Sequence, residues 1–235
     1  ETLTRARRLL PDEDPSAAAE SALLCLDKGD LEGATQHIDA ASIRGEGAIV
    51  SYVRGNIAAN QGHLKAAQSY FSEAIEMDPT HVRARLNRAS IHMASGNAQG
   101  ALDDANILLE LAPGLALAKL RRAEANMLLS KWDDAKQDLE QIVTEAPHHH
   151  HALTQLASCF ISMERPEKAE GPLNEALRLA PDHTAAWHQR GLLYLDWGRE
   201  DAALNDFEAA VRCDGNNLDA RLHIAAIHHE AGRFV

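Results

Sequence analysis

The sequence lacks long apolar segments and is poor in cysteine. None of its 235 residues belongs to an apolar run of about 18 or more, so we expect no membrane-spanning helix. The cysteines are Cys25, Cys159 and Cys213, an odd number without Cys-x-x-Cys spacing. This pattern argues against a disulfide framework or a zinc knuckle, and it predicts three buried small apolar side chains.

Clusters of basic residues are also scarce. The formal net charge is −12, and basic residues gather only at residues 5–8 and at Arg121-Arg122. Proteins that bind nucleic acid need clustered Lys and Arg to displace counterions from phosphate. The sequence therefore argues against nucleic acid as a partner, and we interpret both clusters as solvated helix faces.

Motifs that carry catalysis are absent. The chain has no His-Glu-x-x-His, no glycine-rich phosphate loop and no Gly-x-Ser-x-Gly elbow. His148–His151 form a run of four histidines, but no cysteine supports a metal site there, and the nearby Glu145 lies across Pro147. We predict a protein that is not an enzyme, with no catalytic residue, metal or cofactor.

A period of 34 residues runs through the chain instead. Two antiparallel helices that stack on identical neighbours need small residues where their axes cross and a stop between hairpins. Alanine meets the first need and proline the second. The recurring residues are Ala67, Ala101, Ala135, Ala169 and Ala203, and Pro79, Pro113, Pro147 and Pro181.

The segment from Trp187 to Ala210 is the clearest copy of the pattern. Its marker residues are Trp187, Gly191, Tyr194, Gly198, Ala203, Phe207 and Ala210. Trp-x3-Gly-x2-Tyr followed by Ala-x3-Phe-x2-Ala resembles the tetratricopeptide repeat, a helix-turn-helix hairpin. The resemblance implies an all-α, right-handed superhelical solenoid of antiparallel hairpins with an inner groove, because one hairpin cannot cover its own apolar face.

The period also predicts the organisation of the chain. We expect residues 1–14 to be a linker or the end of a preceding helix, and residues 15–235 to form the array. The expected repeats are 15–47, 48–81, 82–115, 116–149, 150–183 and 184–217, followed by a half repeat at 218–235.

The regular pattern is broken at several places, one of them the end of the sixth repeat, where Gly215 replaces the recurring proline. The first repeat is one residue short, which predicts an irregular joint near residues 44–47. Ser130-Lys131 replaces the usual turn glycine of the fourth repeat. Gly171-Pro172 falls early in the second helix of the fifth repeat, which predicts a kink or a late start because proline removes a backbone hydrogen bond.

The last helix, at 218–235, has no partner helix in this sequence. We expect it to expose Leu222, Ile224 and Ile227, which suggests self-association or continuation in a parent protein. The chain begins at Glu1 rather than Met, which favours a soluble fragment and leaves the compartment open between cytoplasm and periplasm.

The first helix of each hairpin lines the groove in this family, and this resemblance selects candidate binding residues. Fixed positions of these helices would point into the groove, and among them Tyr52 is expected to be an exposed anchor. Trp132, Trp187, Tyr194 and Phe207 are expected to pack in the core or at turns. The candidate peptide-binding groove consists of Tyr52, Asn56, Arg83, Asn87, Arg121, Gln155 and His188.

Three of these positions resemble the clamp with which co-chaperones of the family hold the carboxylates of a Glu-Glu-Val-Asp tail. Asn56, Asn87 and Arg121 occupy its two asparagine positions and its arginine position, whereas Tyr52 and Leu117 replace its two lysines. Asparagine can hydrogen-bond both edges of a peptide backbone, and arginine can hold a carboxylate bidentately. The alternative interpretation is an ordinary solvated helix face.

A second possible feature is a histidine stripe. His151, His188 and His223 are expected to line the C-terminal half of the groove, either as plain polar residues or as groups that attract acidic partners when protonated near pH 6.

We therefore predict a protein–protein interaction scaffold whose concave groove binds a partner peptide or segment. Two alternatives stay open. The array is the targeting or substrate-recruiting arm of a larger enzyme, such as a glycosyl- or sulfotransferase, or it is a structural bridge in a bacterial envelope or polysaccharide-export assembly.

Overall fold

The computed structural model describes residues 15–42 and 47–230. These residues form thirteen α-helices and one short 3-10 helix, which confirms the all-α prediction. The expected linker at residues 1–14 and most of the expected joint at 44–47 lie outside them. No helix in the described residues is long and apolar enough to cross a membrane.

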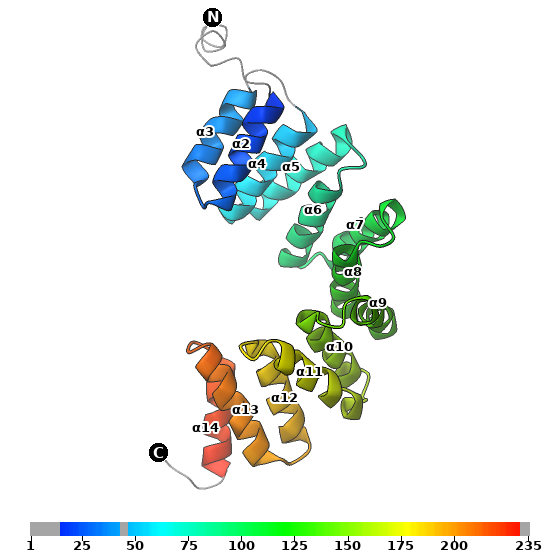
Figure 1. The fold of residues 1–235 in the computed structure, drawn as a ribbon, viewed down its shortest axis with the longest axis vertical. Helices are drawn as coiled ribbons and strands as arrows, with labels where there is room; N and C mark the ends of the chain where they lie inside the picture. The colour runs from blue at the N-terminus through cyan, green and yellow to red at the C-terminus, as the bar shows by residue number, and fades with distance from the viewer. Residues whose placement is uncertain (1–14, 43–46, 231–235) are drawn as a thin grey trace, which may run out of the picture. The chain divides into compact units, whose positions relative to one another are not determined.

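The chain divides into two compact units, residues 1–125 and 126–235, with the boundary inside helix α8. Within the first unit, consecutive helices pair as antiparallel hairpins, and each hairpin packs on the next (Figure 1). The helices up to the boundary are α2 (Pro15–Asp27), α3 (Leu31–Ser42), α4 (Ala48–Asn60), α5 (Leu64–Met77), α6 (Val82–Ala94), α7 (Ala98–Leu111) and α8 (Ala116–Leu128).

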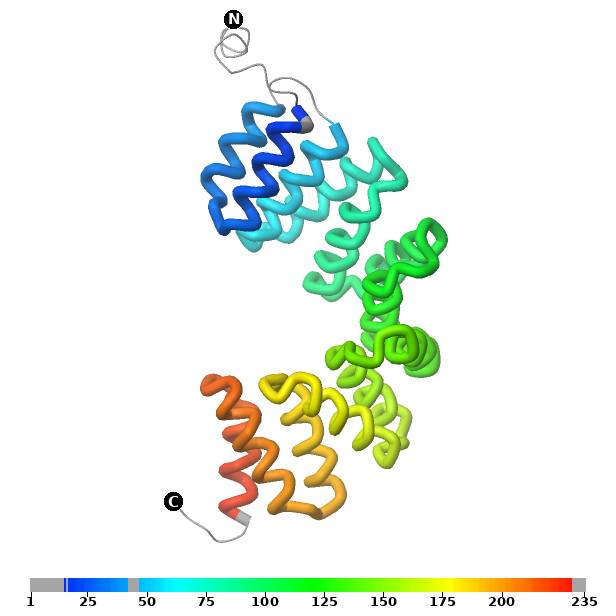
Figure 2. Tube along the Cα trace, in the orientation of Figure 1, coloured from blue at the N-terminus to red at the C-terminus, as the bar shows by residue number. Residues whose placement is uncertain are grey.

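The second unit repeats this arrangement. The chain of this unit runs back and forth through successive helices, and each helix lies against the next (Figure 2). The elements are α9 (Trp132–Glu145), α10 (His150–Ser162), the 3-10 helix η1 (Pro166–Lys168), α11 (Glu170–Leu179), α12 (Thr184–Asp196), α13 (Glu200–Cys213) and α14 (Leu218–Glu230).

The recurring alanines and prolines have the roles expected of them. Ala67, Ala101, Ala135, Ala169 and Ala203 are all fully buried, so they lie where two helices approach. Each recurring proline stands in the turn two residues after the end of a hairpin's second helix; for example, α5 ends at Met77 and Pro79 follows. A larger side chain at the alanine positions would hold the helices apart.

Glycine allows the closest contact inside a hairpin. A Cβ atom built on Gly191 would lie 2.8 Å from a ring carbon of Phe207, which is itself fully buried. Gly55 and Phe71 repeat the arrangement in the first unit, with 2.5 Å between the corresponding atoms. The glycine therefore lets the phenylalanine ring lie directly on the backbone of the facing helix.

The turn inside a hairpin requires a left-handed residue. Gly29, Gly62, Gly96 and Gly198 supply it, with φ between 68° and 77°. In the fourth and fifth repeats Ser130 and Glu164 adopt φ 57° at the same place. A non-glycine residue in this conformation costs about 1–2 kcal/mol, so these two turns are strained.

The fifth repeat departs from the pattern as its proline predicts. The second helices of the second, third, fourth and sixth repeats have 14 residues, whereas α11 has 10. The chain first forms η1, and α11 starts only at Glu170, which puts Pro172 in the first turn. Proline is tolerated there because the amide it lacks has no helical partner in any case.

The last helix is more covered than its sequence suggests. Leu222 is 67% exposed, as expected, but Ile227 is buried against α13 and Ile224 is partly buried. The prediction of three exposed residues was wrong because α14 turns its Ala220–Ile227 stripe toward Phe207. The prediction of three buried cysteines was also wrong, since only Cys159 is buried.

We expect Gly191→Ala to lower the free energy of unfolding by about 1–3 kcal/mol, because the new methyl group forces the Phe207 ring to shift. Urea denaturation followed by circular dichroism measures this change. Phe207→Leu in the same chain is the control. The double variant should lose less stability than the sum of the two single losses, and strict additivity would contradict the close contact.

Candidate functional site

Equivalent positions of neighbouring first helices meet on each unit. In the first unit the ninth residue of one repeat, Asn56 on α4, lies beside the sixth residue of the next, Asn87 on α6. In the second unit the same two positions are Ser158 on α10 and Gln189 on α12, which line one pocket. The 34-residue period therefore produces two candidate binding sites of the same register but different chemistry.

The first site is built on an asparagine pair. The Asn87 side-chain amide donates a hydrogen bond of 2.6 Å to the carbonyl oxygen of Asn56. Neither side chain forms another hydrogen bond within the described residues, so one amide NH₂ and one carbonyl oxygen remain available. If both side-chain amides were turned by 180°, so that their oxygen and nitrogen atoms exchanged places, the pair would still have one free donor and one free acceptor. The pair can therefore accept a hydrogen bond from a backbone N–H group of a peptide and donate one to a backbone carbonyl of the same peptide.

Arg83 and Arg121 are the two arginines that the sequence proposed for this groove, and they differ in availability. Arg83 precedes Asn87 by one helical turn on α6, is exposed, and forms no ion pair within the described residues. Arg121 on α8 donates a hydrogen bond of 2.6 Å to Glu124, so its charge is already matched. Arg83 is thus the better candidate to hold a ligand carboxylate.

Tyr52 is not the exposed anchor that the sequence predicted. Its side chain is buried on α4, with its ring centroid 4.9 Å from that of His81 and 6.1 Å from that of Phe71. His81 also accepts a hydrogen bond from the amide of Ala84 at the start of α6. The expectation failed because the histidine that caps α6 covers the tyrosine.

The second site is an open pocket of about 650 Å³ between α10 and α12. Ser158 is too short to reach across as Asn56 does, and no hydrogen bond joins it to Gln189. The side-chain oxygen of Gln189 is buried and has no hydrogen-bond partner among the residues that the structure describes. The lining residues are Ser158, Ile161, Ser162, Glu164, Pro166, Gln189, Leu192, Leu193 and Asp196.

The lining of this pocket combines two acidic residues with apolar ones. Glu164 and Asp196 are exposed, and neither forms an ion pair with any residue that the structure describes. Ile161 and Leu192 are 37% and 38% exposed, so each presents apolar surface at the pocket. Of the sequence-predicted residues, Gln155 is partly buried on α10 and does not line this pocket.

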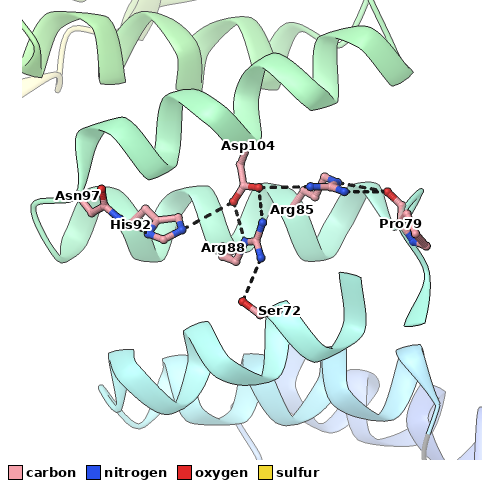
Figure 3. A network of polar contacts seen from close by, with 7 residues as sticks. All are labelled: Ser72, Pro79, Arg85, Arg88, His92, Asn97 and Asp104. Atoms are coloured by element: carbon pink, nitrogen blue, oxygen red, sulfur yellow. Dashed lines mark hydrogen bonds and ion pairs between the residues drawn. The ribbon is translucent and has the colours of Figure 1, made fainter. Parts of the chain in front are cut away.

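One helix of each site, α6 or α12, is fixed by an arginine–aspartate clasp. We use this term for an arginine on the first helix of a hairpin that is hydrogen-bonded to a buried aspartate on the second helix. Arg88 on α6 holds Asp104 on α7 with hydrogen bonds of 2.8 and 2.6 Å and reaches Ser72 on α5 at 3.0 Å (Figure 3). Hydrogen bonding to Asp104 raises the pKa of Arg88. Arg85 and His92 also face this carboxylate, at 3.5 and 4.0 Å.

The same clasp recurs in the second unit. Arg190 on α12 holds Asp206 on α13 at 2.7 and 2.8 Å, and donates to Asn174 on α11 at 2.7 Å. The arginine also lies over the rings of Trp187 and Tyr194. Each clasp arginine directly follows the site residue, Asn87 or Gln189, so it fixes that residue's helix on both neighbouring helices.

Our reading of the sequence missed the clasp, although the signal was present. Arg54, Arg88, Arg122 and Arg190 share one repeat position, and Asp104, Asp138 and Asp206 follow 16 residues after the last three of them. The fifth repeat breaks the series with Leu156 and Pro172. Surface arginine is so common that only the buried aspartate makes this pattern informative.

Histidines of the second unit form close contacts rather than an open stripe. His188 packs on Phe207 and His223, with ring centroids 5.6 and 5.5 Å apart, and His150 packs on His183 at 5.0 Å. Burial, and then the nearby His223, lower the pKa of His188, so it gains charge below the usual histidine range. No group of three or more possible metal ligands occurs in residues 15–42 and 47–230.

Comparison with known families agrees with this architecture. Models described as tetratricopeptide repeat match residues 52–116, 126–190 and 184–217, well over half of the chain. The chain belongs to the tetratricopeptide repeat family. Its membership implies a role in protein–protein interaction, in a family of scaffolds that are typically not enzymes. A sequence search of curated proteins gave no match.

Solved tetratricopeptide repeat structures share the fold at low sequence identity. The chain is similar to pilF of Pseudomonas aeruginosa, with 14% identity, a TM-score of 0.75 and coverage of 96% of this chain and 100% of that one. It is also similar to a tetratricopeptide repeat protein from Parabacteroides merdae, with 16% identity, a TM-score of 0.71 and coverage of 96% of this chain and 90% of that one. A third similar structure is YrrB, described as having an unusual peptide-binding site. Its identity is 17% and its TM-score 0.58, and the match covers 76% of this chain and 92% of YrrB.

We expect Asp206→Asn to lower the free energy of unfolding by about 2–3 kcal/mol, because it weakens two charged hydrogen bonds and leaves Arg190 without its counterion. Asp104→Asn should have a similar effect. Asp103→Asn, at the exposed neighbouring position, is the matched control and should change stability by no more than about 0.5 kcal/mol. Equal losses at positions 103 and 104 in urea denaturation would refute the role of the clasp.

The pKa of His188 also predicts a pH dependence of stability. Because its pKa is lower in the folded than in the unfolded chain, the unfolded chain binds more protons as pH falls below about 6.5. Folding stability should therefore decrease in this range. Asp219 opposes the shift and His223 strengthens it. His188→Gln should reduce the slope of unfolding free energy against pH; an unchanged slope would show that His188 does not contribute.

Proposed function

We propose that the chain is an interaction scaffold that binds an extended, acidic segment of a partner protein across α4 and α6. The observation that carries this proposal is the Asn56–Asn87 pair, which leaves one donor and one acceptor free on neighbouring hairpins. An extended peptide presents an alternating donor and acceptor along its backbone, and the pair is complementary to them.

The charge near the pair supports an acidic ligand. Arg83 lies one turn from Asn87 on the same face of α6, and its guanidinium has no partner within the described residues. An arginine can form two parallel hydrogen bonds with a carboxylate. The bound segment would thus be held by its backbone at Asn56 and Asn87 and by one acidic side chain or its terminus at Arg83.

The comparisons support binding of this general kind. YrrB, at 17% identity, is described as a repeat protein with an unusual peptide-binding site. The clasp adds a physical reason for affinity, because Arg88 fixes α6 against α5 and α7 before any ligand arrives. A preorganised site loses less conformational entropy on binding.

The test uses a fluorescently labelled synthetic peptide of Glu, Asp, Gly and Ser. We expect Asn87→Ala and Arg83→Ala each to weaken its binding about tenfold, the equivalent of one or two lost hydrogen bonds. Asn87→Ala should change the free energy of unfolding by no more than about 1 kcal/mol. Fluorescence anisotropy measures the first quantity and urea denaturation the second.

Gln99→Ala, on the exposed face of the second helix α7, is the matched control and should bind the peptide normally. Normal binding by the α6 variants together with lost binding in Gln99→Ala would assign recognition to the second helices and overturn the proposal.

A further inference from the structure

We propose that the pocket between α10 and α12 binds a lysine or arginine side chain of a partner segment that also carries an apolar residue. The inference rests on the proposed interaction function, but it concerns a different unit and the opposite ligand charge. It does not depend on the Asn56–Asn87 pair.

The lining fixes the sign of the charge. Glu164 and Asp196 both line the pocket without a counterion among the described residues, and no lysine or arginine is part of the lining. An anionic ligand would meet two unpaired carboxylates, whereas a cation would neutralise them.

The apolar lining matches the rest of a basic side chain. Lysine and arginine carry three or four methylene groups that pack on apolar surface while the charged end stays near water. Ile161 and Leu192 offer such a surface in this pocket, and Leu193 is buried beneath it. A pocket of about 650 Å³ has room for such a side chain and a neighbouring apolar one.

The unpaired amide of Gln189 gives the site a polar contact for the ligand's backbone. Its side-chain oxygen is buried and has no hydrogen-bond partner, which is unfavourable in the free protein. A rotation of the Gln189 side chain toward the pocket would let the backbone of a bound peptide supply the missing donor. In the first unit, at the equivalent positions of α4 and α6, the hydrogen bond between Asn56 and Asn87 occupies this space.

Glu164 lines the pocket, but its backbone conformation in the hairpin turn is strained. Its position in the hairpin turn is held by glycine in four repeats, and glutamate adopts φ 57° there. The strained turn, followed by η1, brings both Glu164 and Pro166 to the pocket. Replacing Glu164 by glycine should therefore relieve strain and remove a ligand contact at once.

The test measures binding of short blocked peptides to the 235-residue chain by titration with NMR detection. The probe contains Leu-Arg-Leu between Gly and Ser residues, and matched peptides carry citrulline or Glu in place of Arg. We expect the Arg peptide to shift the amide signals of residues around Gln189 and Leu192. The Glu164→Gln/Asp196→Asn variant should bind it about tenfold more weakly, and added salt should weaken binding in the unchanged chain.

Glu164→Gly should raise the melting temperature and still weaken binding, a combination that loss of folding cannot produce. Asn87→Ala and Arg83→Ala should bind the Arg peptide normally, so a failure of the α6 site is distinguishable from a failure of this one. Equal binding of the Arg and Glu peptides, equal binding of spermidine and the Arg peptide, or undiminished binding by the double variant would each overturn the proposal.

Discussion

A buried carboxylate on the second helix of a hairpin holds one helix of each candidate site in place. Asp104 and Asp206 are almost fully buried, and each is stabilised by two hydrogen bonds from an arginine that also reaches the preceding hairpin. Apolar packing of alanine and phenylalanine can slide along a helix, but a bidentate ion pair cannot, because its geometry is directional. The clasp therefore fixes the register between hairpins, and register decides which side chains meet on the first helices.

The period of the sequence was sufficient to predict the hairpins. Alanine and proline at 34-residue intervals report close helix contact and helix ends, two steric effects that recur with the period of the chain. The late start of α11 followed from Pro172 for the same reason. The environment of Tyr52 and Ile227 was not predictable in this way, because each depends on a neighbour far along the chain, His81 in one case and Phe207 in the other.

The candidate sites were only partly visible in the sequence. Family resemblance selected Asn56 and Asn87, and their mutual hydrogen bond gives them a common orientation that spacing alone does not reveal. It also selected Arg121, which Glu124 already neutralises. The pocket between α10 and α12 depends on what is missing, namely a side chain at position 158 long enough to reach Gln189. The sequence does not show that no contact bridges these two positions, so only the structure reveals the pocket.

The two sites differ in charge because the repeat separates framework from contact positions. The clasp residues and the buried alanines keep their identity in most repeats, whereas the sixth and ninth positions vary and include Asn, Arg, Gln, Ser, Glu, Val and Leu. The fifth repeat gives up the clasp and the turn glycine together: Pro172 stands where the aspartate would be, and Glu164 where the glycine would be. Its first helix is then held mainly by apolar contacts, with Leu156, Leu153 and Ala157 buried in place of an ion pair. Substituting packing for charge removes the desolvation cost of a buried pair, so this repeat can carry a strained turn beside a pocket and still close its hairpin.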